Sequence, residues 1–291
     1  MKVCLACAQR FDMEEWRCPV CGHAPARRNG VVSFAPELAD ANSGFQADYF
    51  GQLAAREAGH FWFRSRNRLV CWALRRYFPA MQTFLEVGCG TGFVLSGIRR
   101  EFPELRLHGS EIFSDGLAFA GQRLPGVALF QMDARRIPFA DEFDVIGAFD
   151  VLEHVEDDAA VLQQMFQAVT PGGGIVLTVP QHRWLWSAVD DYSFHKRRYG
   201  RDALLEKIQR AGFQVLRVTS FVFLLLPMLL LSRLWRVGSS AGSDPLAEYK
   251  IPSWVNTVFE SALDLERCLI ATGLSLPAGG SLLVVARRGR R

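Results

Sequence analysis

Two pairs of cysteines near the amino end of the chain have the spacing of a metal site. Cys4 and Cys7 form one Cys-x-x-Cys turn, and Cys18 and Cys21 form the second. Each turn can direct two thiolates at one ion, and two turns complete the tetrahedral shell that Zn²⁺ prefers. A disulfide or a redox-active pair is less favoured, because we expect a cytosolic chain and no strand–helix context surrounds the cysteines. The spacing therefore predicts a zinc ribbon over residues 1–30.

Three glycines at alternate positions form a loop that could hold a ligand. Gly88, Gly90 and Gly92 follow an apolar stretch that contains Glu86. Without side chains, they let the backbone turn sharply out of a strand and let a ligand approach closely. A glycine loop that stands alone could equally be a tight strand–helix turn, so its meaning depends on the residues placed beside it.

Acidic residues end the next three expected strands. Glu111 lies about 20 residues after the glycine loop along the chain, which is the separation at which a carboxylate binds the hydroxyls of a ribose. Asp133 and Asp150 end the strands after it. Together with Glu86, they place four acids at one edge of the sheet. Such a lining repels the pyrophosphate of a dinucleotide but attracts a ligand that carries a sulfonium and an α-amino group. The acids therefore favour S-adenosylmethionine over NAD.

Histidines near this edge are candidates for general bases. His154 follows Asp150 and Glu153 at a spacing that places the three side chains on one face of a helical turn. His154, His182 and His195 could each remove a proton from an acceptor hydroxyl, a step that a neutral amine or an activated carbon does not need. Two interpretations of the first group stay open. The three side chains could bind a divalent metal ion, or Glu153 and His154 could cap and orient the turn.

The elements that must position these side chains follow from the hydrophobic pattern. From residue 81 onward, short apolar runs alternate with amphipathic stretches, which is typical of a parallel sheet flanked by helices. The expected strands cover residues 83–87, 106–110, 128–132, 143–149, 175–179, 213–219 and 282–286. The expected helices cover residues 45–56, 69–77, 93–101, 114–123, 158–169, 203–211 and 255–271. Seven strands in alternation with helices predict an α/β fold with a doubly wound sheet.

The order and spacing of these motifs resemble those of the class I S-adenosylmethionine-dependent methyltransferases. The resemblance rests on Leu85–Gly92, Glu111, Met132-Asp133, Phe149–Val155 and Pro171–Gly174. It implies a Rossmann-like, seven-stranded sheet whose last strand is antiparallel, in a domain of residues 61–291. It also implies a glycine loop under the methionine moiety, Glu111 on the ribose and Asp133 near the adenine amino group. The cofactor-binding residues expected on this basis are Glu86, Gly88, Gly90, Gly92, Glu111, Ile112, Asp133, Ala134 and Asp150.

Three segments are candidates for contacts beyond the cofactor. Residues 181–199 interleave aromatic with basic side chains, which suits an anionic, ring-bearing or phosphate-bearing lipid acceptor but also a packed lid. Residues 60–67 are aromatic and basic too, and they could fold over the cofactor or simply pack a helix. An apolar insertion near residues 218–236 has arginines at its ends and contains Pro227, which is expected to break or kink any helix there. This insertion could contact a membrane surface, cover the cavity or form a dimer contact.

Composition and charge limit the classes of function. The 291 residues are 49% hydrophobic and 22% charged, which is typical of a packed globular protein. The net charge of +3 depends on four arginines in the last five residues, so a broad nucleic-acid-binding face is not supported, although a local patch stays open. The amino end has no long apolar segment, and the apolar run at 218–232 is shorter than the about 20 residues of a spanning helix. We therefore expect a cytoplasmic protein, with peripheral membrane contact as an option.

These observations predict an S-adenosylmethionine-dependent methyltransferase with a structural zinc ribbon and a partly helical connector at residues 31–60. The methyl acceptor, a small or lipid-linked molecule, is not named by the sequence, nor is the oligomeric state or the partner of the ribbon. One alternative is an RNA methyltransferase whose ribbon presents the nucleic acid, against which the low basic charge and the apolar run count. The other is a non-catalytic protein that docks a partner through the ribbon, against which the complete set of pocket residues counts.

Overall fold

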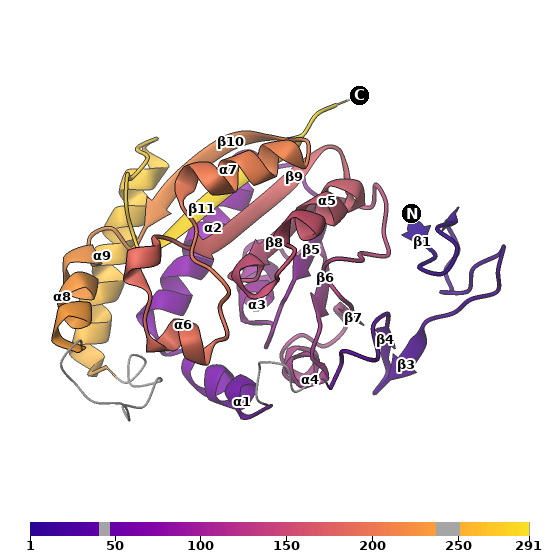
Figure 1. The fold of residues 1–291 in the computed structure, drawn as a ribbon, viewed down its shortest axis with the longest axis horizontal. Coiled ribbons are helices and arrows are strands. Elements are labelled where there is room, and N and C mark those ends of the chain that lie inside the picture. The colour runs from indigo at the N-terminus through magenta and orange to yellow at the C-terminus, as the bar shows by residue number, and fades with distance from the viewer. Residues whose placement is uncertain (41–46, 237–250, 291) are drawn as a thin grey trace.

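The centre of the fold is a nine-stranded sheet with the strand order β10-β11-β9-β8-β5-β6-β7-β4-β3 (Figure 1). The computed structural model describes residues 1–40, 47–236 and 251–290. Neighbouring strands from β9 to β4 are parallel, whereas β11 is antiparallel to both β9 and β10. The expected doubly wound sheet, with its last strand antiparallel, is confirmed in β5 to β11. Two short strands, β4 and β3, extend it beyond β7.

The elements alternate along the chain as the hydrophobic pattern predicts. The strands are β1 (Lys2–Val3), β2 (Arg10–Phe11), β3 (Ala26–Arg28), β4 (Val31–Ser33), β5 (Thr83–Val87), β6 (Arg106–Glu111), β7 (Ala128–Gln131), β8 (Phe143–Phe149), β9 (Val169–Pro180), β10 (Phe213–Phe221) and β11 (Ser281–Arg288). The α-helices are α1 (Ala47–Arg56), α2 (Phe61–Tyr77), α3 (Phe93–Glu101), α4 (Ser114–Arg123), α5 (Asp158–Ala168), α6 (Ala188–Tyr192), α7 (Arg201–Arg210), α8 (Leu226–Arg236) and α9 (Ser253–Ala271). Two 3₁₀ helices are η1 (Leu152–His154) and η2 (Arg183–Leu185).

The main departures from the expected bounds concern α1, α2 and β9. Helix α1 begins at Ala47, and the expected start at residues 45–46 lies outside the described residues. Helix α2 begins at Phe61, because the imidazole of His60 caps its first turn by accepting a hydrogen bond from the Trp62 amide. Strand β9 begins at Val169 and includes the glycine-rich stretch that was expected to precede it.

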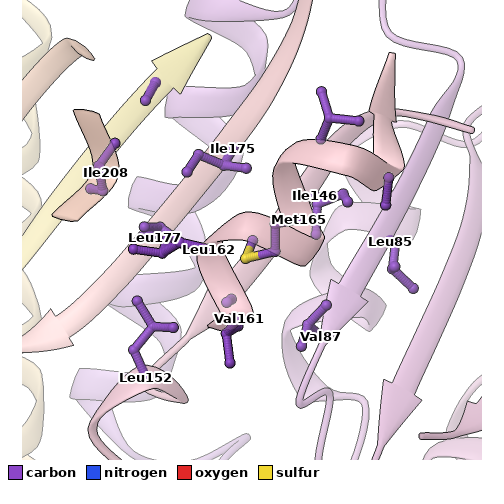
Figure 2. Close-up of a cluster of buried hydrophobic side chains, with 14 of the residues drawn as sticks. Leu85, Val87, Ile146, Leu152, Val161, Leu162, Met165, Ile175, Leu177 and Ile208 are labelled. Atoms are coloured by element: carbon purple, nitrogen blue, oxygen red, sulfur yellow. The ribbon is translucent and has the colours of Figure 1, made fainter. Parts of the chain in front are cut away.

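Helices cover both faces of the sheet and bury two apolar cores. Helices α2, α3, α4 and α9 contribute to one core, and α5 and α7 contribute to the other. Figure 2 shows Leu162 and Met165 of α5 lying over Ile146, Ile175 and Leu177 of the sheet, and all five side chains are fully buried. Burial of such side chains supplies the main driving force for folding.

The amino-terminal module is attached to the sheet rather than separate from it. Its β1 and β2 pair with each other, while β3 and β4 join the edge of the main sheet next to β7 (Figure 1). The Val3 amide donates a hydrogen bond to the Pro138 carbonyl over 2.9 Å. The ring of Trp16 packs edge-on against Phe34 and Phe139, with ring centroids 4.6 and 5.3 Å apart. This module is therefore anchored beside the loop that follows β7.

The apolar insertion is divided between two elements. Residues 218–221 end β10, and α8 begins at Leu226. The prediction that Pro227 breaks a helix here is wrong, because Pro227 lies in the first turn of α8, where its missing N–H costs no helical hydrogen bond. The side chains of Arg233 and Arg236 lie outside the described part of the chain. Among the described helices, none is both long and apolar enough to cross a membrane.

Candidate functional site

A cavity of 1190 Å³ lies at the carboxyl end of the central strands. The chain runs from β5 outward to β6 and β7 and then returns to β8 on the other side of β5. Such a reversal leaves a crevice beyond the strand ends, which is where ligands of this sheet type bind. The expected cofactor residues that line the cavity are Glu86, Gly88, Gly90, Glu111, Ile112, Asp133, Ala134 and Asp150. Gly92 is not among the lining residues.

The glycine loop needs glycine for two physical reasons. Gly88, Gly90 and Gly92 all have positive φ angles of +69°, +51° and +75°, which residues with a side chain rarely adopt. A Cβ at Gly88 would also lie 2.5 Å from a methyl carbon of Val151. Gly92 is the N-cap of α3, and its role is therefore to turn the chain into that helix.

Glu111 holds the glycine loop in place. One carboxylate oxygen accepts a hydrogen bond from the Gly90 amide at 3.0 Å, and the other accepts one from the Ile112 amide at 2.8 Å. Burial raises the pKa of Glu111, and these backbone hydrogen bonds oppose the rise. Sequence analysis assigned this residue to the ribose alone. The structure shows a task that this prediction did not include, because the carboxylate ties the end of β6 to the loop, while the contact with the ribose stays a prediction.

Glu86 offers an unsatisfied polar atom to the cavity. Its side chain is 2% exposed, and within the described residues one carboxylate oxygen has no hydrogen-bond partner. Burial raises its pKa well above the usual value, and the charge of Arg66 opposes that rise. A buried acceptor without a partner is costly unless a ligand donor satisfies it. A ligand with an ammonium or sulfonium group fits this position.

Two of the four acids expected at this edge of the sheet form ion pairs with arginines. Asp133 forms a two-pronged ion pair with Arg135, at 2.7 Å for the shorter contact between side-chain termini. Asp150 pairs with Arg66, whose guanidinium also lies over the ring of Trp62 at 4.3 Å. The expected lining of four free acids was therefore too negative. The arginines that neutralise these two acids come from a neighbouring turn and from α2. The spacing of the acids along the sequence does not predict them.

A polar network fastens α1 and α4 to the same loop. One guanidinium nitrogen of Arg123 lies 2.7 Å from the Glu57 carboxylate and 2.9 Å from the Thr91 carbonyl oxygen. The Thr91 hydroxyl also donates to Glu57. Tyr49 and Phe50 of α1 thereby reach the cavity wall. Sequence analysis missed these two aromatic residues, since they lie in a segment expected only to connect two domains.

Two of the three candidate histidines meet in the cavity. The rings of His154 and His195 lie nearly perpendicular, with centroids 4.7 Å apart, and both line the wall. Burial and the neighbouring His195 lower the pKa of His154 to about 3, so its imidazole is neutral at physiological pH. His195 Nδ1 lies 2.8 Å from a carboxylate oxygen of Asp190. His182 instead stacks on Trp184 and does not line the cavity.

Another part of the cavity wall is apolar. It is lined by Val222 and Leu225 between β10 and α8, by Met228 and Leu229 of α8, and by Phe259 of α9. Met228 is 47% exposed, so the apolar wall continues to the surface. The cavity therefore offers a polar, histidine-bearing side and an apolar side to one bound molecule.

The four ribbon cysteines form a separate cluster. The sulfurs of Cys4 and Cys21 lie 3.6 Å apart, as do those of Cys7 and Cys18, and all four lie within 4.8 Å of one another. Thiolates bound tetrahedrally to Zn²⁺ at about 2.3 Å have sulfurs about 3.8 Å apart. The residues therefore fit the ion that their spacing predicts.

Comparisons with known proteins agree with this geometry. A family model described as "Methyltransferase domain" matches residues 54–218, more than half of the chain. A Mycolicibacterium smegmatis protein named "Probable S-adenosylmethionine-dependent methyltransferase" is 29% identical over 163 residues, which cover 54% of this chain and 60% of the relative. The chain therefore spans less than two thirds of the length of this relative.

Solved structures with the same fold include two methyltransferases. Phosphoethanolamine N-methyltransferase 2 of Haemonchus contortus, in complex with S-adenosyl-L-methionine, superposes with a TM-score of 0.50 at 18% identity and covers 77% of this chain and 53% of its own. A Thermotoga maritima structure described as a SAM-dependent methyltransferase has a TM-score of 0.53 at 14% identity, and the match covers 83% of this chain and 95% of that one. At these identities the likeness concerns the fold.

Proposed function

The chain belongs to the methyltransferase-domain family, and from this membership we propose that it transfers the methyl group of S-adenosylmethionine to a small or lipid-linked acceptor. The observation that carries the proposal is the glycine loop, which Glu111 holds open beneath a cavity of 1190 Å³. The unsatisfied oxygen of Glu86 supports a cationic ligand beside that loop. A dinucleotide would bring a pyrophosphate to the same place and would be repelled.

Each expected cofactor residue that lines the cavity has a proposed contact. Gly88 and Gly90 leave room for the methionine moiety, and Glu86 accepts a hydrogen bond from its amino group. Glu111 accepts hydrogen bonds from the ribose with the lone pairs that its backbone contacts leave. Asp133 keeps its ion pair with Arg135 and lies beside the adenine. The remaining expected contacts to the cofactor are those of Ile112, Ala134 and Asp150, all on the cavity wall.

When bound, S-adenosylmethionine supplies a methyl carbon made electrophilic by its sulfonium. The chain's own task is to align an acceptor in line with that carbon and to exclude water. Arg66 contributes by pairing with Asp150 and packing on Trp62, which fixes the end of β8 against α2. We expect His195, held by Asp190, to orient the acceptor through a hydrogen bond or through a bound ion.

The two sides of the cavity support an acceptor with a polar head and an apolar part. His154, His195, Lys196 and Arg198 line the polar side, whereas Leu225 and its neighbours line the apolar one. The exposed side chains of Leu224, Met228, Leu230 and Leu231 continue the apolar side at the surface. Peripheral contact with a membrane, through which a lipid-linked acceptor would enter, is part of this proposal.

The amino-terminal module is proposed to hold one structural Zn²⁺ through Cys4, Cys7, Cys18 and Cys21. Its anchorage through Trp16 supports a structural role more than the presentation of RNA, since the module is packed against the methyltransferase body. A partner protein for this module stays an open proposal. Because four thiolates close the coordination shell, the ion would contribute folding free energy and no chemistry.

Calorimetric titration tests the cofactor proposal. S-adenosylmethionine, and separately NAD, is titrated into the full-length zinc-loaded protein, into Glu111→Ala and into the control Glu104→Ala, whose side chain is exposed. We expect S-adenosylmethionine to bind the wild type and the control equally, and to bind Glu111→Ala at least tenfold more weakly, because the loop and the ribose both lose their acceptor. Equal binding to all three proteins, or preference for NAD, would refute the proposal.

The acceptor proposal has its own test. The protein is mixed with liposomes of neutral and of anionic phospholipid at low salt, and flotation is compared for the wild type, Leu231→Ser and the control Thr272→Ser. Thr272 follows α9, where its backbone amide caps the helix. We expect the wild type and the control to float and Leu231→Ser to float less, since exposed apolar area sets binding. If the wild type stays unbound to both liposomes, the membrane part of the proposal is wrong.

A further inference from the structure

Three metal-ligating side chains from two distant segments meet on the polar wall of the cavity. Glu153 and His154 belong to η1, and His195 follows α6. One ligand atom from each of the three lies within 4.8 Å of the other two. The backbone holds the two segments together, because the Lys196 amide donates a 2.7 Å hydrogen bond to the Glu153 carbonyl. Side-chain rotations of modest size would bring the atoms to the about 3 Å spacing of ligands bound at about 2.1 Å.

Glu153 is the feature that most needs an explanation. Its side chain is fully buried, yet within the described residues neither carboxylate oxygen has a hydrogen-bond partner. It lines the cavity and therefore does not lie within the apolar core. A buried carboxylate without donors is destabilising unless it binds a proton or a cation. A cation placed between Glu153 and the two imidazoles would satisfy both oxygens.

His195 has the surroundings of a metal-ligating histidine. Its Nδ1 lies 2.8 Å from Asp190, and Arg198 makes two further hydrogen bonds to the same carboxylate, at 2.8 and 2.9 Å. A carboxylate that accepts the Nδ1 proton fixes the tautomer and leaves the Nε2 lone pair for an ion. The other acid of the expected set, Asp150, is instead paired with Arg66. The structure therefore replaces Asp150 with His195 as the third partner of Glu153 and His154.

We propose that Glu153, His154 and His195 bind a divalent transition-metal ion on the acceptor side of the cavity, with positions left open for an acceptor oxygen. The inference deepens the proposed methyl transfer and rests on it. Two imidazoles and one carboxylate favour Mn²⁺, Fe²⁺, Co²⁺ or Zn²⁺ over Mg²⁺ and Ca²⁺, which prefer oxygen ligands. The proposal thereby favours a hydroxyl as the methyl acceptor.

The reaction then balances without a further reagent. The ion makes the bound acceptor hydroxyl more acidic, and its proton passes to solvent. The acceptor oxygen forms a bond to the methyl carbon as the carbon–sulfur bond breaks. The electron pair of that bond stays on sulfur, which turns the sulfonium into a neutral thioether. His154 and His195 serve as ligands in this arrangement and not as bases.

Manganese binding tests the site directly. The full-length protein is first given one equivalent of Zn²⁺, which the four soft thiolates of the ribbon take up ahead of the cavity site, and a zinc content of one ion per chain is checked before Mn²⁺ is added. Mn²⁺ is then titrated while the signal of the free ion is followed by electron paramagnetic resonance. We expect one Mn²⁺ per chain in the wild type and in the control His182→Gln, a histidine outside the cavity wall. Glu153→Gln and His195→Gln should each bind Mn²⁺ at least 100-fold more weakly.

The outcomes separate this inference from the proposed function. A wild type that binds no Mn²⁺ at millimolar concentration, or variants that bind it as the wild type does, would overturn the site. Because His195 is only partly buried, His195→Gln is expected to fold, and its thermal unfolding and S-adenosylmethionine titration check this. Binding of S-adenosylmethionine without Mn²⁺ would leave the methyltransferase proposal standing and remove the metal. Binding of Mn²⁺ by a protein that does not bind S-adenosylmethionine would leave the metal site standing and remove the methyltransferase proposal.

Discussion

The described part of the chain contains two clusters of side chains that could bind a metal ion, and they differ in almost every physical respect. The ribbon cluster consists of four cysteines from one short stretch, packed beside Phe11 and Trp16. The cavity cluster joins Glu153 and His154 to His195, which follows them by more than forty residues. Four like thiolates close a tetrahedral shell, whereas two imidazoles and a carboxylate leave positions open. The first arrangement suits an ion that holds structure, and the second suits an ion that meets a substrate.

The difference shows how each cluster depends on the rest of the fold. The ribbon cluster is built within its own module, and that module needs the body only as a support. The cavity cluster has no local module, because η1 and the segment after α6 are separated along the chain by α5 and β9. Removal of an ion from the cavity cluster should therefore leave the fold intact. Disturbance of the fold should weaken the binding of that ion.

The largest effect is expected from removing one ribbon thiolate. In Cys18→Ser, we expect the zinc content to fall from one ion per chain to near zero and residues 1–25 to lose protection against amide hydrogen exchange. Structural zinc contributes about 10 kcal/mol or more to modules of this size, so the module has little else to hold it. Atomic emission measures the zinc, with Cys268→Ser, an exposed cysteine of α9, as the control. Zinc retained by Cys18→Ser would erase the distinction between the two clusters.

The next largest effect is expected from removing the charge of Asp158, whose hydrogen bonds and ion pairs form a frame behind the cavity cluster. Asp158, 2% exposed, accepts hydrogen bonds from Lys207 at 2.6 Å and from Tyr199 at 2.7 Å, and it pairs with Arg197 at 3.0 Å. It thereby joins the start of α5 to α7 and to the segment that precedes α7. We expect Asp158→Asn to lower the free energy of unfolding at pH 7 by about 3 kcal/mol, because two partly buried cations lose the charge of a buried carboxylate. Urea unfolding measures it, and the exposed Asp202→Asn should stay within about 0.5 kcal/mol of the wild type.

The pH dependence of this frame has a definite sign. Burial by itself raises the pKa of Asp158, but the hydrogen bonds from Lys207 and Tyr199 outweigh it and hold the pKa below the usual 3.8. Its contribution to stability is therefore present above the pKa of the unfolded chain and is lost as the pH falls through the lower pKa of the folded one. Asp158→Asn should differ from the wild type most near neutral pH and least in strong acid. A difference that grows toward acid would contradict this assignment.

Sequence reasoning succeeded where neighbours along the chain decide the structure. The seven strands from Thr83 to Arg288 follow from local apolar runs, and the ribbon cysteines lie in two tight turns. The glycine loop is likewise fixed by residues next to one another. Strands β3 and β4 were not predicted, because three residues are too few to show a period of two.

The cavity cluster was predicted only in part for a physical reason. The spacing of Asp150, Glu153 and His154 suggested a ligand set, but which side chains face one another depends on contacts across the fold. Arg66 comes from α2 to occupy Asp150, and His195 comes from beyond α6 to replace it. Charge pairing between segments leaves no local pattern, so such a set becomes visible only in three dimensions.

The ribbon's attachment to the body should give a smaller effect than its zinc. Trp16 packs on Phe34 and Phe139 at the border with the sheet. We expect Trp16→Ala to cost about 2 kcal/mol, less than the 3–5 kcal/mol of a fully buried tryptophan, because the ring is only partly buried. Hydrogen exchange of the Val3 amide, which bonds to Pro138, should quicken while the zinc content stays at one. The control is Trp254→Ala, since Trp254 is 70% exposed.

The smallest expected effect is on Mn²⁺ affinity. It comes from Asp190, a residue that does not contact the proposed ion, and it tests the difference between the two clusters directly. Asp190 holds His195 and caps α6 through the Ser187 amide at 2.8 Å. In Asp190→Asn the side-chain oxygen can still accept one hydrogen bond, but Arg198 loses its anionic partner, so thermal unfolding must first show that the variant is folded. Mn²⁺ affinity should nevertheless fall about tenfold, the lower end of what such supporting carboxylates contribute. Within the described residues, no carboxylate supports the ribbon thiolates in this way, so zinc content should not change. A variant with full Mn²⁺ affinity would show that His195 is oriented by packing alone, and that the cavity cluster is as self-contained as the ribbon.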